Sequence, residues 1–105
     1  MRLSEEQMEY LRVLGHELTP SVQVGAGGLT TYVLYQIDHA LNTQELVKVR
    51  VTYGDRRRRS DTLDKLAPQT GATLVQRENN AAVLYRPATQ PVIDLPAQQR
   101  AVQAS

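Results

Sequence analysis

The chain has 105 residues, of which 41% are hydrophobic, and a formal net charge of +1. This length accommodates one hydrophobic core, so we expect a single domain. The lack of cysteine excludes disulfide bonds and thiolate zinc sites, and it favours a reducing, cytoplasmic setting. Because no stretch approaches the roughly 18 apolar residues of a membrane span, we expect neither export nor membrane insertion.

A first helix is predicted near the N-terminus. Ser4 and Gln7 have the spacing of a capping box, in which the two residues satisfy each other's backbone N–H groups. Apolar residues then recur at intervals of three and four, which is the helical period. Pro20 disfavours helical backbone before it, so the helix should end near Leu18. Gly15 weakens the helix by roughly 1 kcal/mol relative to alanine, which matters if the helix packs closely there.

A short strand at residues 21–24 and a second helix at residues 31–42 flank a glycine-rich junction. The strand alternates polar residues with valine, and the helix has apolar residues at helical spacing with Thr30 as its N-cap. Tyr32 and Tyr35 lie on this helix just after the junction. Each could stack on an unpaired base, but packing at the edge of the core is the favoured interpretation.

The sequence LVKVRVTY, residues 46–53, predicts the clearest strand of the chain. Its β-branched residues alternate with polar ones, which suits a pleated and half-buried strand. The valines are predicted to face the core. Lys48 and Arg50 then lie on the opposite face, which we expect to be open and positively charged.

A third helix is predicted over residues 55–70, with Gly71 as its left-handed stop. Pro68 should kink or loosen the last turn. The first turn contains the arginine run, which consists of Arg56, Arg57, Arg58 and Arg59. Cations at this end oppose the helix dipole, so local stability does not explain them. The run is either a solvated helix face or a phosphate-binding edge.

The C-terminal part predicts a hairpin followed by a tail. Strands at residues 72–77 and 81–86 flank a polar turn. Residues 88–105 have little apolar periodicity and predict an extended or disordered tail, which leaves residues 1–87 as the domain. The order helix, strand, helix, strand, helix, strand, strand predicts an α+β fold in two layers, with three helices on a small mixed four-stranded sheet.

The glycine-rich junction is the glycine loop, which consists of Gly25, Ala26, Gly27 and Gly28. A P-loop is excluded because the next lysine after Gly28 is Lys48. The dinucleotide fingerprint is excluded because Thr30 stands where its third glycine is required. What remains is a Gly-x-x-Gly pattern, which is either a turn whose bare amides can approach phosphates or merely a tight turn.

Catalytic and metal-binding patterns are weak. His16 and His39 lie on different predicted helices and have no cysteine or histidine at ligand spacing. No serine lies in a nucleophile-elbow context. We therefore expect a non-enzymatic protein that needs no cofactor and no metal ion.

Several separated signatures occur together in this chain. They are His16, Leu18 and Pro20 before the first strand, Leu29 and Thr30 after the glycine loop, the sequence ELVKVRV, and LYRP at residues 84–87. Over residues 11–51 and 70–87 the chain resembles the stand-alone bacterial CRM domain, the YhbY type of RNA-binding protein. The resemblance implies the fold of the C-terminal domain of bacterial translation initiation factor 3. It further implies association with precursors of the large ribosomal subunit, and relatives in plant organelles act in intron splicing.

The resemblance also implies that the glycine loop contacts RNA. Family members commonly have lysine or a similar polar residue where this chain has Ala26, so here the loop offers amides without a side-chain cation. The hypothesis is a monomeric ribosome assembly factor that binds ribosomal RNA in pre-50S particles. The alternative is a protein-interaction module that binds a ribosomal protein or assembly partner without RNA contact. The residues assigned to RNA binding are Gly25, Ala26, Gly27, Gly28, Thr30, Lys48, Arg50, Arg56, Arg57, Arg58 and Arg59.

Overall fold

The computed structural model describes residues 2–96. Its elements in chain order are α1 (Glu5–His16), β1 (Val22–Val24), α2 (Thr31–Gln44), β2 (Leu46–Val51), α3 (Arg56–Thr70), β3 (Thr73–Arg77) and β4 (Ala81–Tyr85). This order and the α+β class are those predicted. The last nine residues of the predicted tail lie outside the described residues.

Two helices begin after their predicted N-caps, Ser4 and Thr30, whereas Asp55, predicted as the first residue of the third helix, is its N-cap. Ser4, Thr30 and Asp55 each accept a hydrogen bond from the backbone N–H of the third residue of the following helix. At Ser4 the capping box is complete, because the Gln7 side chain accepts from the Ser4 backbone N–H at 3.1 Å. Local sequence patterns therefore determine where each helix starts.

The ends of α1 and α2 differ from the sequence expectation, whereas the end of α3 agrees with it. α1 ends at His16, two residues before the predicted Leu18. α2 continues to Gln44, past the predicted end at residue 42, and stops because Glu45 adopts a positive φ of 68°. α3 continues through Pro68 to its predicted stop at Gly71, where φ is 67°.

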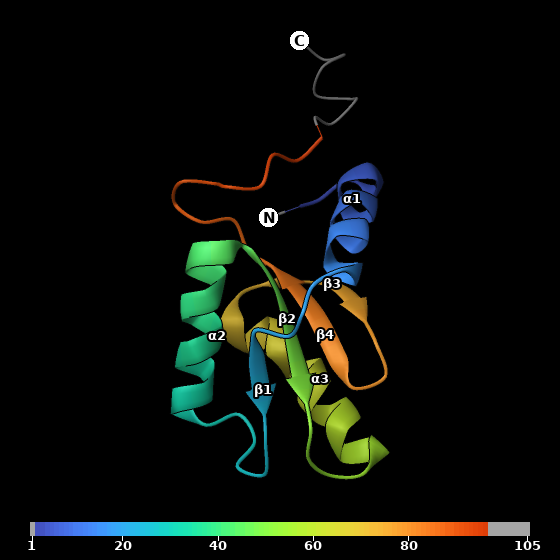
Figure 1. The fold of residues 1–105 in the computed structure, drawn as a ribbon, viewed down its shortest axis with the longest axis vertical. Coiled ribbons are helices and arrows are strands. Elements are labelled where there is room, and N and C mark those ends of the chain that lie inside the picture. The colour runs from blue at the N-terminus through green and yellow to red at the C-terminus, as the bar shows by residue number, and fades with distance from the viewer. Residues whose placement is uncertain (1, 97–105) are drawn as a thin grey trace.

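The four strands form one mixed sheet in the order β1-β2-β4-β3 (Figure 1). β1 and β2 are parallel, whereas β2 with β4 and β4 with β3 are antiparallel. β1, with three residues, is one edge of the sheet, and β3 is the other. The β1–α2 and β2–α3 connections therefore leave the sheet at the same end, which is the lower end in Figure 1.

Helices cover both faces of the sheet, which corrects the two-layer expectation. α2 and α3 pack on one face, over a core that includes Val47, Val49 and Leu84. α1 packs on the other face, where Leu11 lies in a smaller cluster with Val83 and Tyr85. The second cluster forms because β4 is buried on both faces, so alternate residues need two covering layers.

Gly15 allows the close approach of α1 to the sheet. A Cβ atom at this position would lie 2.7 Å from Cγ1 of Val83, which is too short for any real contact. The residue is buried in spite of its position on a surface helix. The low helix propensity of glycine is thus offset by packing against β4.

The C-terminal segment (residues 88–96) packs on the α1 side of the molecule and forms no helix or strand. Ile93 and Leu95 pack against the smaller core cluster. The carboxylate of Glu45, which is fully buried, accepts hydrogen bonds from the backbone N–H groups of Ala88, Val92 and Ile93. The described half of the predicted tail is therefore anchored to the domain, and the sequence did not indicate this.

The buried carboxylate affects two pKa values. Burial opposes ionisation of Glu45 and is the largest single influence, but the three N–H donors together outweigh it and hold the pKa of Glu45 below its ordinary value. Burial raises the pKa of Tyr85, and the negative charge of Glu45 raises it further. Glu45 is therefore anionic near neutral pH although water does not reach it.

Candidate functional site

The glycine loop forms a hydrogen-bonded turn between β1 and α2. The N–H of Gly28 donates to the carbonyl of Gly25 at 3.0 Å, and the N–H of Thr30 donates to the carbonyl of Gly28 at 3.0 Å. Within residues 2–96, the N–H groups of Ala26 and Gly27 donate to no protein acceptor. Two adjacent amides at an exposed turn are therefore available to an external anion.

The turn itself requires glycine at one position. Gly28 has a φ of 71°, a left-handed conformation that favours glycine. Gly25 and Gly27 have no such φ, a Cβ at Gly25 would meet nothing within 4 Å, and one at Gly27 would make an ordinary contact with Thr30. A tight turn alone would need Gly28 only. The fold does not require glycine at positions 25 and 27, where the lack of a side chain leaves the backbone accessible.

The glycine loop lies beside the first turn of α3. A pocket of about 150 Å³ is lined by the loop residues Gly25, Ala26 and Gly28, by Val24 and Val51 of the strands, and by Tyr53, Arg58 and Thr62. The guanidinium of Arg58 lies 5.6 Å from the centre of the Tyr53 ring, within the range of a cation–π contact. This contact places the Arg58 cation at the wall of a pocket that Gly25, Ala26 and Gly28 also line.

The arginine run divides into two parts. Arg56, Arg57 and Arg58 are exposed. Arg59 is half-buried and donates a hydrogen bond from Nη1 to the carbonyl of Gly54, so it supports the β2–α3 connection. Three of the four arginines therefore present free charge to solvent at the same end of the sheet as the glycine loop.

The expectation that Lys48 lies on an open face is wrong. The Lys48 side chain is only 8% exposed, and its Nζ pairs with the Glu78 carboxylate at 3.1 Å. Arg50 is half-buried, and its Nε is buried without a hydrogen-bond partner among the described residues. Both side chains lie on the sheet face opposite α2 and α3, because the alternating valines occupy the α2 and α3 face. The structure does not bring them to the arginine run.

The expectation that Tyr32 and Tyr35 pack at the edge of the core is also wrong. These residues are 67% and 64% exposed. The ring of Tyr35 stacks on His39, with centroids 6.3 Å apart and planes inclined by 22°. Both tyrosines lie on the outer surface of α2, near the edge strand β1.

Comparison with known proteins identifies the family. The family model of the CRS1/YhbY (CRM) domain matches residues 3–86. The chain belongs to this family. An RNA-binding protein of Haemophilus influenzae is 40% identical over 94 residues, which cover 90% of this chain and 95% of the relative. A CRM-domain containing chloroplast factor of Arabidopsis thaliana is 28% identical over 86 residues, which are 82% of this chain and 8% of that protein.

A solved structure supports the fold of this CRM domain. The solution structure of a Staphylococcus aureus protein, described as a candidate RNA-binding protein, matches with a TM-score of 0.75 and 33% identity. The match covers 90% of this chain and all of the other. The mixed four-stranded sheet with three helices is thus shared with that protein.

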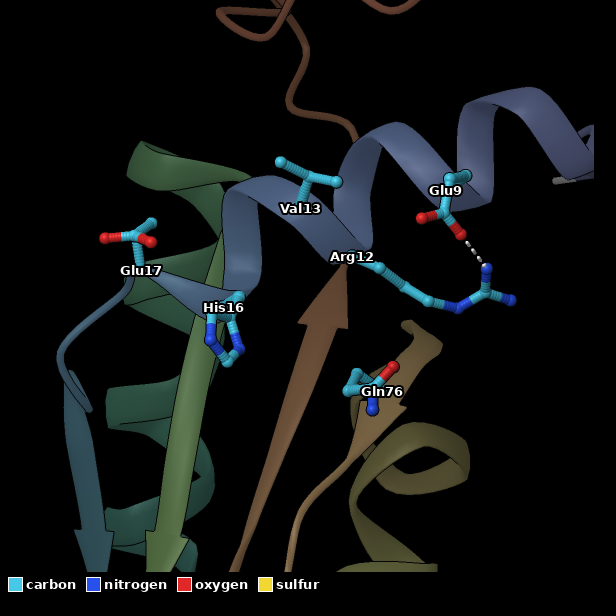
Figure 2. Close-up of a pocket in the computed structure, with 6 residues that line it drawn as sticks. All are labelled: Glu9, Arg12, Val13, His16, Glu17 and Gln76. Atoms are coloured by element: carbon cyan, nitrogen blue, oxygen red, sulfur yellow. Dashed lines mark hydrogen bonds and ion pairs between the residues drawn. The ribbon is translucent and has the colours of Figure 1, made fainter.

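A second pocket, of about 300 Å³, lies between α1 and β3 and holds none of the predicted site residues. Figure 2 shows its lining, in which Arg12 extends along the pocket and pairs with Glu9 at 2.8 Å. His16 and Gln76 lie at the same pocket, and Glu17 lies at its far end (Figure 2). The charged side chains that line this pocket are paired, as in Arg12 with Glu9, or exposed, as in Glu17. The pocket therefore does not concentrate charge of one sign.

The described part of the CRM domain holds no cluster of three or more His, Asp or Glu side chains placed to bind a metal ion. Within residues 2–96, no helix is long and apolar enough to cross a bilayer.

Tyr53 is the site residue that sequence reasoning missed. It was assigned to the end of a strand, but β2 ends at Val51, and Tyr53 instead lies in the connection to α3 with 45% of its surface exposed. The available signal was its place directly before Gly54 and the N-cap Asp55. A tyrosine in a loop next to four arginines is a candidate for a cation–π contact.

Proposed function

We propose that this CRM domain binds RNA through the glycine loop and the exposed arginines Arg56, Arg57 and Arg58. The observation that carries the proposal is that the glycine loop and Arg58 line one pocket, with Arg56 and Arg57 exposed in the same first turn of α3. The loop also contains two N–H groups, of Ala26 and Gly27, that donate to no acceptor within residues 2–96. Amides without a nearby Cβ and a cation are the two groups that hold a phosphate. The RNA-binding name of the Haemophilus influenzae relative supports the same ligand.

In this proposal the backbone amides of the loop position a phosphate group, and the arginines supply the positive charge. Ala26 and Gly27 have small or no side chains, so the loop brings no cation of its own. Arg56 and Arg57 make no ion pair with another described residue and remain free for phosphates. Thr30 lies at the same place, but its hydroxyl already accepts from the Val33 N–H at 3.1 Å.

We further propose that the RNA is ribosomal RNA and that the protein acts as a monomeric assembly factor of the large subunit. This part rests on the resemblance of the glycine loop, the ELVKVRV strand and the LYRP closure to the YhbY type. Lys48 and Arg50 are left outside the proposed contact surface, because their side chains are buried or half-buried on the other face.

The double variant Ala26→Asp, Gly27→Asp tests the loop. It places two carboxylates against the phosphates, and neither position has a φ that a side chain would strain. RNA affinity, measured by fluorescence anisotropy, should fall at least about tenfold because charge repulsion replaces amide contacts. A matched control, Gln69→Glu with Gln90→Glu, makes the same charge change at exposed positions outside the site.

Two outcomes decide the proposal. If the loop variant loses RNA affinity and the control keeps nearly wild-type affinity, the result supports RNA contact by the glycine loop. Equal affinity of both variants, with unchanged circular dichroism, overturns it.

For the ribosomal assignment, the protein should co-sediment with pre-50S particles and be released by RNase digestion. Co-sedimentation that persists after digestion would favour the protein-interaction alternative.

A further inference from the structure

A groove of about 470 Å³ runs between the edge strand β1 and the outer face of α2. Its lining includes no lysine, arginine, aspartate or glutamate. The residues that line it are Ser21, Val22, Tyr32, Tyr35, Gln36, His39, Ala40, Thr43 and Gln44. The groove therefore offers aromatic, amide and hydroxyl groups in place of formal charge, and it suits a flat, uncharged and polar ligand.

Tyr32, Tyr35 and His39 form the aromatic side of this groove. They stand at intervals of three and four on α2, so they share one face of the helix. Tyr32 and Tyr35 are each about two-thirds exposed, and no core contact accounts for them. Tyr35 and His39 already stack on each other, which fixes the direction of the Tyr35 ring. Exposed rings held in this way are preformed stacking surfaces.

The groove begins where the glycine loop ends. Tyr32 is the second residue of α2, and only Leu29, Thr30 and Thr31 separate it from the glycine loop. From Tyr32 to Gln44 the helix rises about 18 Å, whereas stacked nucleotides are about 3.4 Å apart. A single strand whose phosphates lie against the loop amides would meet Tyr32 first and Tyr35 next.

The amide side chains suit the edges of bases. Gln36 and Gln44 each carry a donor and an acceptor. Gln36 donates only a long hydrogen bond of 3.4 Å to the Tyr32 hydroxyl, and Gln44 accepts from the Ser21 hydroxyl at 3.2 Å. Both contacts are exposed and can be exchanged for contacts with a base.

We infer that this groove, the tyrosine groove, binds at least two unpaired bases of the RNA strand whose phosphates the glycine loop holds. Tyr32 and Tyr35 stack on the bases, and Gln36 and Gln44 contact base edges. The inference rests on the proposed function, since the loop places the strand. It identifies the ligand as single-stranded RNA, because a duplex would keep its bases away from the rings.

The test compares two probes with the full chain: fluorescein-labelled octauridine and an RNA of the same length with abasic positions. Tyr32→Ala with Tyr35→Ala should weaken octauridine binding at least about tenfold, since each stacked base contributes strongly to affinity. The same variant should bind the abasic RNA as the wild type does. Tyr32→Phe with Tyr35→Phe keeps the rings and should bind octauridine within about twofold of the wild type.

Controls separate this inference from the proposed function. Tyr10→Ala removes an exposed tyrosine from α1, on the other face of the sheet, and should leave both affinities unchanged. The Ala26→Asp, Gly27→Asp variant should lose affinity for both RNAs. Unchanged octauridine binding by the tyrosine-to-alanine variant, or equal losses for both probes, overturns the tyrosine groove alone. No binding of either RNA by the wild type overturns the proposed function as well.

Discussion

The carboxylate of Glu45 accepts a hydrogen bond from the backbone N–H of Ile93 at 2.7 Å and thereby ties the end of α2 to the C-terminal segment. The two residues are 48 positions apart in the chain. Two more N–H groups of the segment donate to the same carboxylate, at 2.6 and 3.0 Å. A single buried side chain therefore organises the C-terminal segment, and its removal has defined consequences.

Glu45→Ala should lower the free energy of unfolding by about 2–3 kcal/mol, because hydrogen bonds to a buried charge are lost. Glu45→Gly should be less harmful by about 1 kcal/mol, since glycine relieves the cost of the positive φ. Urea unfolding measures both. Glu17→Ala, at an exposed position after α1, is the control and should change stability by less than about 0.5 kcal/mol. An equal loss of unfolding free energy in the alanine and glycine variants would show that the positive φ at residue 45 costs no stability.

The stability that Glu45 contributes should depend on pH. Its folded-state pKa lies below the ordinary value of 4.5, so the carboxylate binds protons less readily in the folded state than in the unfolded state. The contribution is complete above the unfolded pKa and is lost as the pH falls through the folded pKa. The difference in Tm between the wild type and Glu45→Gln should therefore shrink as the pH is lowered from 7 to below 4. A difference that stays constant would disprove this linkage.

Gly15→Ala should destabilise the protein although alanine is the better helix former. The helix gains about 1 kcal/mol, but the new methyl group meets Val83 at 2.7 Å in a buried strand, and overpacking costs about 1–3 kcal/mol. Thermal unfolding measures the net loss. In a Val83→Ala background the same change should be less costly, which a double-mutant cycle detects. Additive effects would show that α1 does not pack against Val83 as described.

Lys48→Met should affect stability and leave RNA binding unchanged. The ion pair with Glu78 is lost, but Glu78 is one-third exposed and can be solvated, so a change of about 1 kcal/mol or less is expected. The comparison variant is Arg57→Gln, which should weaken RNA binding at unchanged stability. A fall in RNA affinity in Lys48→Met, without unfolding, would restore the strand-face prediction made from the sequence.

Features set by neighbouring residues could be predicted from the sequence. The caps at Ser4 and Thr30, the alternation of β2 and the order of all seven elements follow from local spacing. The exposure of Arg56 follows in the same way, since both interpretations of the arginine run place it in solvent.

Features set by distant residues could not be predicted. Lys48 had the pattern of an open strand face, but its side chain is nearly buried and pairs with Glu78 of the β3–β4 turn. The partners of Glu45 are 43 to 48 positions away, and no local pattern identifies them. Tyr32 and Tyr35 were expected to pack at the edge of the core, yet they are exposed, and the buried residues of α2 are Ile37, Ala40 and Leu41. Tertiary packing decides all three cases.

The salt dependence of RNA binding shows whether Arg56, Arg57 and Arg58 contact phosphates. Three free arginines on single-stranded RNA predict a slope of about −2 for the logarithm of the binding constant against the logarithm of salt concentration. Replacing Arg56, Arg57 and Arg58 by glutamine should bring the slope close to zero without unfolding α3, since those cations oppose its dipole. Lys65→Gln, further along the same helix, should keep the wild-type slope. A wild-type slope near zero, or an unchanged slope in the triple variant, would show that these arginines do not bind the RNA.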